Sequence, residues 1–206
     1  MTDQVPAKLI IRASDLLDLL SGAIIATGKD DSLPTLTGIY LESFSTEDDL
    51  GGLSATATDR WRLITGKTHW KGEAFTALLR NKDASEVIRA LKPLAKRREE
   101  RGIWLEVTER EITFRLPDQT FTFRLLDGTF PKYEHLLEEH KEDTGHIAVN
   151  PKFLGDFAKV PTGPSGRGYV EPVKFTFHGD SKLVTITVGH PTITWRGGIM
   201  PMRFNS

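Results

Sequence analysis

One pattern of predicted elements recurs three times along the chain, and it constrains the fold more than any other feature of the sequence. Each round begins with a short apolar strand, continues through an amphipathic helix and ends in three strands separated by turns. The rounds begin near Lys8, Ala74 and Ile147, a spacing of about seventy residues. Equal elements at equal spacing predict three copies of one βαβββ unit, which makes the repeat the first property to establish.

Helix signals and turn residues set the expected boundaries. Ser14 is a good N-cap for the first helix, whose apolar spacing continues to Ile25. Pro93 lies inside the second helical pattern, so we expect that helix to end or kink near Lys92. The expected strands are 8–12, 36–44, 53–58 and 61–68 in the first unit, 74–79, 103–108, 111–116 and 119–126 in the second, and 147–150, 173–178, 183–188 and 192–202 in the third. The expected helices span 14–25, 84–98 and 151–160.

The stretch that follows the second unit, residues 123–137, is unusually apolar for a surface connection. Asp127 and Gly128 predict a turn, and Pro131 biases Phe130 towards an extended backbone. Exposed apolar stretches of this kind either seal a junction between domains or bind a partner. The charged segment 138–145 that follows is the expected break between two domains.

Composition narrows the class of protein. The 206 residues include no cysteine, which excludes disulfides, thiolate catalysis and Cys-ligated zinc and fits a reducing compartment. The sequence has no apolar run of 18 residues and no signal-peptide core, so we expect a cytoplasmic protein of a bacterium or of a phage-infected host, with no membrane association. The net charge of −1 disfavours a protein coated in nucleic acid but allows basic residues to gather on one face.

No arrangement typical of an active site stands out. His135, His140 and His146 lie among acidic residues but match no metal-binding spacing, so a solvated linker is the simpler interpretation. The Gly-rich segment 163–168 lacks the GK[ST] ending of a phosphate-binding loop. No nucleophile motif and no paired carboxylates are evident. We therefore expect a protein without catalytic residues, cofactor or metal.

Basic residues instead gather around the second helix. Lys82, Arg89 and Lys96 are seven residues apart, which places them on one stripe opposite much of the apolar face. Lys152 and Lys159 have the same spacing on the third helix, whereas the first helix carries acidic residues. Such a stripe is either a solvated face or a non-specific contact for the phosphate backbone of nucleic acid.

Three segments together resemble the bacterial DNA polymerase III beta sliding clamp family. They are TATDRWRL at residues 56–63, LDGTFPKY at residues 126–133 and MPMR at residues 200–203, in the family's order and on the βαβββ repeat. Segment 1–139 resembles the family's middle domain, with half-units at about 8–70 and 71–139. Segment 140–206 resembles one half-unit of a further domain, ending in the MPMR tail.

The resemblance implies an α+β fold, the DNA-clamp or processivity fold, with helices on the inner face and antiparallel sheets outside. In the family a closed ring encircles duplex DNA and tethers the polymerase without reading sequence. Lys82 and Arg89 match positions that line the hole, and Lys29 matches a DNA-contacting loop, where Pro34 and Thr35 replace the family's tyrosine pair. The expected DNA-binding residues are Lys29, Lys82, Arg89, Lys96, Lys152 and Lys159.

The resemblance also implies a hydrophobic pocket that accepts short linear motifs of the polymerase, the clamp loader and repair proteins. Methionine adapts to varied ligands, arginines at a rim hold carboxylate or carbonyl groups, and Trp61 would narrow the cleft. The expected pocket residues are Thr58, Arg62, Leu63, Pro131, Leu136, Met200, Pro201, Met202 and Arg203.

The assembly and the role leave alternatives. The family's ring contains twelve half-units, so three per chain require four chains and two-fold contacts. A trimeric ring built on a compressed second domain is the rival arrangement. The expected role is a homo-oligomeric sliding clamp; the alternative is a non-ring adaptor or decoy for clamp-binding motifs. An unrelated α+β enzyme is the third possibility.

Overall fold

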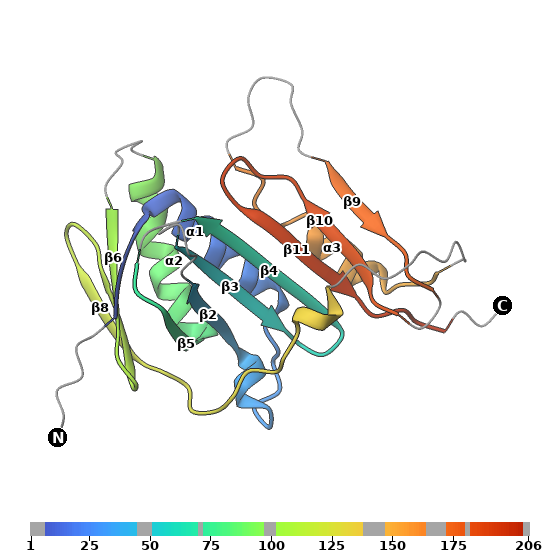
Figure 1. Ribbon diagram of the computed structural model, residues 1–206, viewed down its shortest axis with the longest axis horizontal. Helices are drawn as coiled ribbons and strands as arrows, with labels where there is room; N and C mark the ends of the chain where they lie inside the picture. Colours follow the sequence, from blue (N-terminus) through green and yellow to red (C-terminus); the bar gives the residue numbers. More distant parts are fainter. Residues whose placement is uncertain are drawn as a thin grey trace.

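The computed structural model describes residues 7–44, 51–69, 72–96, 102–137, 147–163, 172–179 and 182–203. Its strands form two antiparallel sheets, and its helices pack against them, as the expected α+β fold requires (Figure 1). The expected break at 138–145, with His140 and His146, lies outside the described residues. Nothing in the structure therefore tests the proposed division at residue 139.

The first unit contains β1 (Ala7–Arg12), α1 (Ala13–Ala23), β2 (Gly38–Phe44), β3 (Gly52–Thr58) and β4 (Arg62–His69). Two short 3₁₀ helices, η1 (Ile24–Ala26) and η2 (Pro34–Thr37), lie between α1 and β2. The second unit contains β5 (Phe75–Arg80), α2 (Asn81–Lys96), β6 (Gly102–Val107), β7 (Glu111–Arg115) and β8 (Thr120–Arg124), and η3 (Glu134–Leu136) follows it. The third unit contains α3 (Pro151–Phe157), β9 (Val173–Thr176), β10 (Val184–Val188) and β11 (Thr194–Ile199).

The first two units exchange their leading strands. β1 of the first unit pairs with β6 of the second, and β5 of the second pairs with β2 of the first. The helices α1 and α2 pack side by side between these pairings (Figure 1). Each unit thus closes the sheet of the other, so the two units share one core.

The third unit continues the sheet of the first. β11 pairs with β4, which gives a seven-stranded sheet in the order β5-β2-β3-β4-β11-β10-β9 beside the four-stranded sheet β1-β6-β7-β8. Trp195 of β11 is fully buried at this seam, where Gly22 of α1 and Gly66 of β4 leave room for its ring. A methyl group on Gly66 would lie 2.4 Å from the ring of Trp195. Close packing of this kind fixes the third unit on the first.

The structure corrects three boundary predictions. α1 begins at Ala13, directly after β1, with Arg12 in the cap position and no side-chain cap, so Ser14 lies inside the helix. α2 continues past Lys92 to Lys96 with Pro93 inside it. Pro93 is exposed, so the carbonyl that loses its hydrogen bond can be solvated.

The third correction concerns the leading strand of the third unit. Residues 147–150 form no regular strand, although their sequence is as apolar as β5; they make a single bridge, between Ala148 and Met202. A strand needs a neighbour along its length, and among the described residues this segment has only that single bridge. The other predicted strands are present with boundaries that shift by a few residues, the largest shifts being at the ends of the third unit.

Candidate functional site

Three segments that are far apart in the sequence converge where β4 meets β11. Leu63 of β4 lies opposite Gly198 of β11, and the Met200 amide donates to the Trp61 carbonyl over 3.0 Å. Two residues later, the Met202 amide donates to the Ala148 carbonyl over 2.8 Å. The turn 58–62 and the tail 200–203 therefore meet at one end of the seam. The linking stretch 130–137 packs on Leu63 of the same seam.

The turn between β3 and β4 is organised by the Asp59 carboxylate. Its Oδ1 accepts the amides of Trp61 and Arg62, each over 3.1 Å. The Thr58 hydroxyl donates to the Arg62 carbonyl over 2.8 Å and accepts the Arg60 amide over 3.2 Å. Arg60 adopts φ of 78°, a left-handed conformation that is strained for a residue with a Cβ. This turn holds the indole of Trp61 outward, with 59% of the residue exposed.

Arg62 connects this turn to α3 of the third unit. Its Nε lies 3.2 Å from Asp59 Oδ2, its Nη1 binds the Asp156 carboxylate, and its guanidinium lies over the Phe153 ring, 4.9 Å from the centroid. Asp156 also binds Lys159, 2.5 Å away. Two carboxylates thus neutralise Arg62, which we had expected to hold a ligand at the pocket rim. In the structure Arg62 therefore links the turn to α3.

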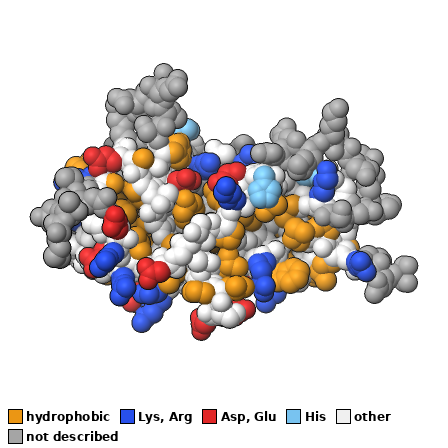
Figure 2. All heavy atoms as spheres, turned by 60° about the horizontal axis from the view of Figure 1, so that its bottom comes forward, with side chains coloured by type: hydrophobic (Ala, Val, Ile, Leu, Met, Phe, Trp, Pro, Cys, Tyr) orange, Lys and Arg blue, Asp and Glu red, His pale blue; other side chains and the backbone are white. Residues whose placement is uncertain are grey.

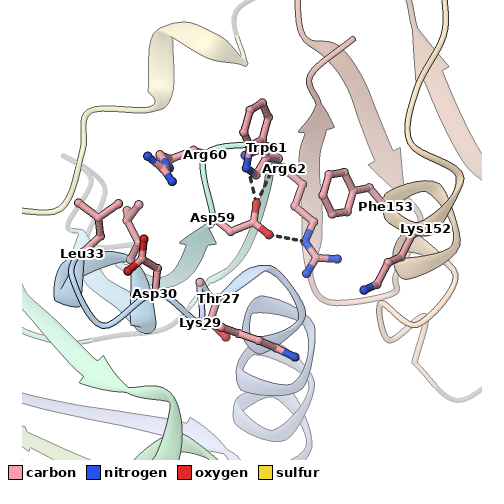
Figure 3. A pocket seen from close by; sticks show the side chains of 12 residues that line it. Thr27, Lys29, Asp30, Leu33, Asp59, Arg60, Trp61, Arg62, Lys152 and Phe153 are labelled. Carbon is pink, nitrogen blue, oxygen red and sulfur yellow. Dashed lines mark hydrogen bonds and ion pairs between the residues drawn. The ribbon is translucent and has the colours of Figure 1, made fainter. Parts of the chain in front are cut away.

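A cavity of about 440 Å³ lies between the turn, the loop before η2 and α3 (Figure 3). Its apolar surface comes from Trp61 and Phe153, with leucines of the η2 region. Figure 3 shows Lys29 and Lys152 reaching towards the space beside the Arg62 guanidinium from opposite sides. The cavity is lined by Thr27, Gly28, Lys29, Asp30, Leu33, Leu36, Asp59, Arg60, Trp61, Arg62, Lys152 and Phe153.

The linking stretch forms a second apolar surface next to this cavity. Phe130, Tyr133 and Leu137 are buried with Leu63 in a small cluster, and the Phe130 ring stacks on Tyr40 with 5.0 Å between centroids. The Thr56 hydroxyl donates to the Tyr133 oxygen over 3.1 Å. Burial raises the pKa of the Tyr133 phenol above its ordinary value.

The stretch thus seals a junction and also exposes part of itself. Pro131 and Leu136 lie on its exposed side, while Tyr133 and Leu137 face the interior. The two interpretations that the sequence left open are therefore compatible.

The predicted pocket residues divide into a floor and a surface. Leu63 is buried and Thr58 half-buried, so they support the site from below. The exposed members, like Trp61, present their side chains to solvent. Figure 2 shows that apolar side chains lie beside basic ones on one face of the molecule. These exposed members are Pro131, Leu136, Met200, Met202 and Arg203, with Pro201 half-buried among them.

Of the twelve residues that line the cavity, sequence reasoning named Lys29, Trp61, Arg62 and Lys152 and missed the other eight, among them Leu33, Arg60 and Phe153. Arg60 and Leu33 extend from the turn and the neighbouring loop, and Phe153 comes from α3. The only sequence signals were the Asp59-Arg60 turn and the apolar start of the third helix. Neither signal shows that the two segments approach each other.

The predicted DNA-binding residues lie on exposed helix and loop positions. Lys82, Arg89 and Lys96 are exposed on α2, opposite the buried Val87 and Leu91. Lys29 and Lys152 are exposed at the cavity, whereas Lys159 is exposed but bound to Asp156. The stripe on α2 is thus exposed, whereas Lys159, two residues after the end of α3, is paired with Asp156.

The described residues contain neither a metal-binding cluster nor a membrane-spanning helix. No group of three His, Asp or Glu side chains there is arranged to hold a metal ion. None of the described helices is both long and apolar enough to cross a membrane.

Comparison with known proteins gives one family and one fold. The model of the DNA polymerase III beta subunit, central domain, matches residues 10–132. Curated protein sequences give no match. Among solved structures, the beta subunit of DNA polymerase III from Thermotoga maritima has a TM-score of 0.78 at 17% identity, covering 100% of this chain and 68% of that one.

Two further sliding clamps show the same fold. The clamp of Pseudomonas aeruginosa has a TM-score of 0.79 at 17% identity, with 99% of this chain and 69% of that one covered. The clamp of Bartonella birtlesii, in a complex with griselimycin, has a TM-score of 0.76 at 18% identity, with 99% and 68% covered. At such identities the likeness shows the fold alone. The family model, however, matches more than half of the 206 residues, so the chain belongs to the DNA polymerase III beta subunit family.

Proposed function

We propose that this protein is a non-catalytic sliding clamp that holds a DNA polymerase on duplex DNA. The observation that carries the proposal is the site at the β4–β11 seam, where three distant segments expose apolar side chains beside a cavity with a cationic rim. The family membership and the clamp fold support the same role. The partners would be double-stranded DNA, bound without sequence preference, and the linear motifs of a polymerase and a clamp loader.

The pocket suits a short peptide with an apolar part and an anionic part. Leu136, Met200 and Met202 present flexible apolar side chains, which adapt to varied ligands. Lys29 and Lys152 provide ammonium groups at the cavity for a carboxylate. Because Arg62 is already paired with two carboxylates, it would position Phe153 and the turn. The ligand's carboxylate would then bind the two lysines.

The exposed stripe of α2 suits the phosphate backbone of DNA. Lys82, Arg89 and Lys96 present positive charge without a shaped pocket, which favours contact with phosphates over recognition of bases. Sequence-independent contact is what a protein that moves along DNA requires.

Peptide binding tests the pocket. A fluorescent clamp-binding peptide from a bacterial polymerase is titrated with the protein and with Met200→Glu, which adds a charge to the exposed apolar surface. We expect the variant to bind at least tenfold more weakly. Trp104→Glu is the matched control, because Trp104 is a similarly exposed apolar residue on β6, away from the seam. Equal binding by wild type and Met200→Glu would refute the assignment.

An adaptor that binds clamp-binding motifs without encircling DNA is the second candidate. The observation that favours it is the acidic first helix, because α1 contains Asp15 and Asp18 but no Lys or Arg and so brings no positive charge to DNA. A primer-extension assay separates the two roles. A clamp lengthens the products made per binding event, whereas an adaptor competes for the polymerase and leaves them short.

A further inference from the structure

Equivalent positions of the three units can be compared by numbering each unit from the first residue of its helix. The fourth residue is Leu16 in α1, Ala84 in α2 and Leu154 in α3. Leu16 and Ala84 are fully buried in the core to which α1 and α2, packed against each other, both belong. Leu154 is 40% exposed, and Gly155 beside it faces open space. α3 is therefore open to solvent at the position where α1 and α2 are buried.

The strand that follows the helix shows the same difference in burial between the second and third units. In β6, Leu105 lies opposite Phe114 on the core side and is fully buried. In β9, Phe175 lies opposite the buried Ile186, so it too is on the core side, yet it is 38% exposed. Val173, two residues earlier, is exposed to the same extent. The core side of β9 is thus apolar but uncovered by the described residues.

The leading strand completes the pattern. In the second unit the Leu126 amide, just after β8, donates to Leu78 of β5 over 2.9 Å, and the other edge of β5 pairs with β2. In the third unit the Met202 amide, just after β11, donates likewise to Ala148. Residues 147–150 therefore occupy the place of β5, but their other edge has no strand beside it in the part of the chain that the structure describes.

We propose that the third units of two copies of this chain combine into one complete domain, related by a two-fold axis. Residues 147–150 of each copy pair with β9 of the other, as β1 pairs with β6 and β5 with β2. These pairs define the register. The residue two places before a helix lies opposite the first core-facing residue of the strand that it pairs with; for α1, Ile11 lies opposite Ile103 of β6. The same rule places Val149 of one copy opposite Val173 of the other, and Ile147 opposite Phe175.

In this arrangement the free surfaces of the two copies complement each other. Each copy offers one leading segment, one uncovered β9 edge and one open helix face, so a two-fold contact satisfies all of them at once and closes. Apolar residues then meet apolar residues across the strand pair, and Leu154 of one α3 packs near that of the other. The dimer contains six units, half of the twelve in the proposed ring, and this inference deepens the proposed function by naming the partner that continues the sheet.

Cysteine cross-linking tests the register, because the natural chain has no cysteine. Directly opposite residues of paired strands have Cβ atoms about 4.5–5.5 Å apart, within reach of a disulfide after small adjustments. The variant Val149→Cys with Val173→Cys is oxidised mildly and run on a denaturing gel without reductant. We expect most of the protein at twice the monomer mass of 23.0 kDa.

The matched control is Val149→Cys with Lys174→Cys. Lys174 neighbours Val173 but its side chain points to the other face of the sheet, so this pair should stay monomeric. Equal cross-linking of both pairs, or none in either, overturns the proposal, as does a monomeric mass of the unmodified chain by light scattering at micromolar concentration.

Association and function are measured separately. Phe175→Asp should lower the mass of the assembly while leaving peptide binding intact, and circular dichroism confirms that the variant is folded. If a folded Phe175→Asp variant forms an assembly of the same mass as the wild type, that result contradicts the dimer and leaves the pocket assignment unaffected. If the wild-type protein does not bind the peptide, that result contradicts the proposed function and leaves the dimer proposal unaffected.

Discussion

Replacing Asp156 by asparagine should destabilise the protein by about 2 kcal/mol. Asp156 binds the Arg62 guanidinium at the seam between the first and third units, and its side chain is 7% exposed. Breaking a buried ion pair costs about 3–5 kcal/mol because one charge stays uncompensated. Here Arg62 keeps Asp59 at 3.2 Å and the Phe153 ring, so the cost should lie near that of a charged hydrogen bond, about 1.5–3 kcal/mol.

Urea denaturation measures this difference. With a slope of about 1–3 kcal/mol per molar urea, the midpoint should fall by roughly 1 M. Lys159→Met is the control, because Lys159 binds the same carboxylate but its side chain is 67% exposed, and exposed pairs contribute about 0–1 kcal/mol. If Asp156→Asn is no less stable than Lys159→Met, Arg62 does not hold α3 on β4.

Three other predictions concern the seam, the sealed junction and the DNA-binding face. Gly66→Ala should cost about 1–3 kcal/mol in thermal or urea unfolding, because its methyl group would overlap the Trp195 ring. Burial raises the pKa of the Tyr133 phenol above 10.0, so the unfolded chain loses that proton at a lower pH than the folded protein does. The free energy of unfolding should therefore fall as the pH rises above 10. Tyr133→Phe should make this fall smaller, as measured by urea denaturation at a series of pH values from 9 to 11. Replacing Lys82 and Arg89 by alanine should lower the slope of log K for DNA against log salt by about 1.8 per copy bound, and an unchanged slope would place DNA elsewhere.

The regular elements were largely predictable because hydrophobic periodicity reports local burial. Alternation identified strands such as β7 and β10, and the apolar spacing of α1 and α2 identified their core-facing sides. Predictions failed where local sequence competes with its surroundings. α1 starts without the cap that Ser14 could provide, because β1 runs straight into it, and Pro93 is tolerated inside α2 because it is exposed.

The site was predictable only in part, because its geometry depends on contacts between distant residues. The resemblance named the segments that converge at the seam. It did not indicate that Asp156, 94 positions after Arg62, would bind that arginine, or that Phe153 and Trp61 would line the same cavity. Residues 147–150 have the composition of a strand but lack a neighbour, and a pattern in one segment cannot report the absence of its partner.

Retention on circular DNA tests the central claim most directly. The protein is assembled on nicked plasmid with a bacterial clamp loader, moved to about 0.5 M salt to weaken contacts with phosphates, and separated from free protein by gel filtration. A clamp that encircles DNA should remain on the circle and leave when one restriction cut makes the DNA linear. Equal retention on circular and linear DNA, or release from both, would contradict the account.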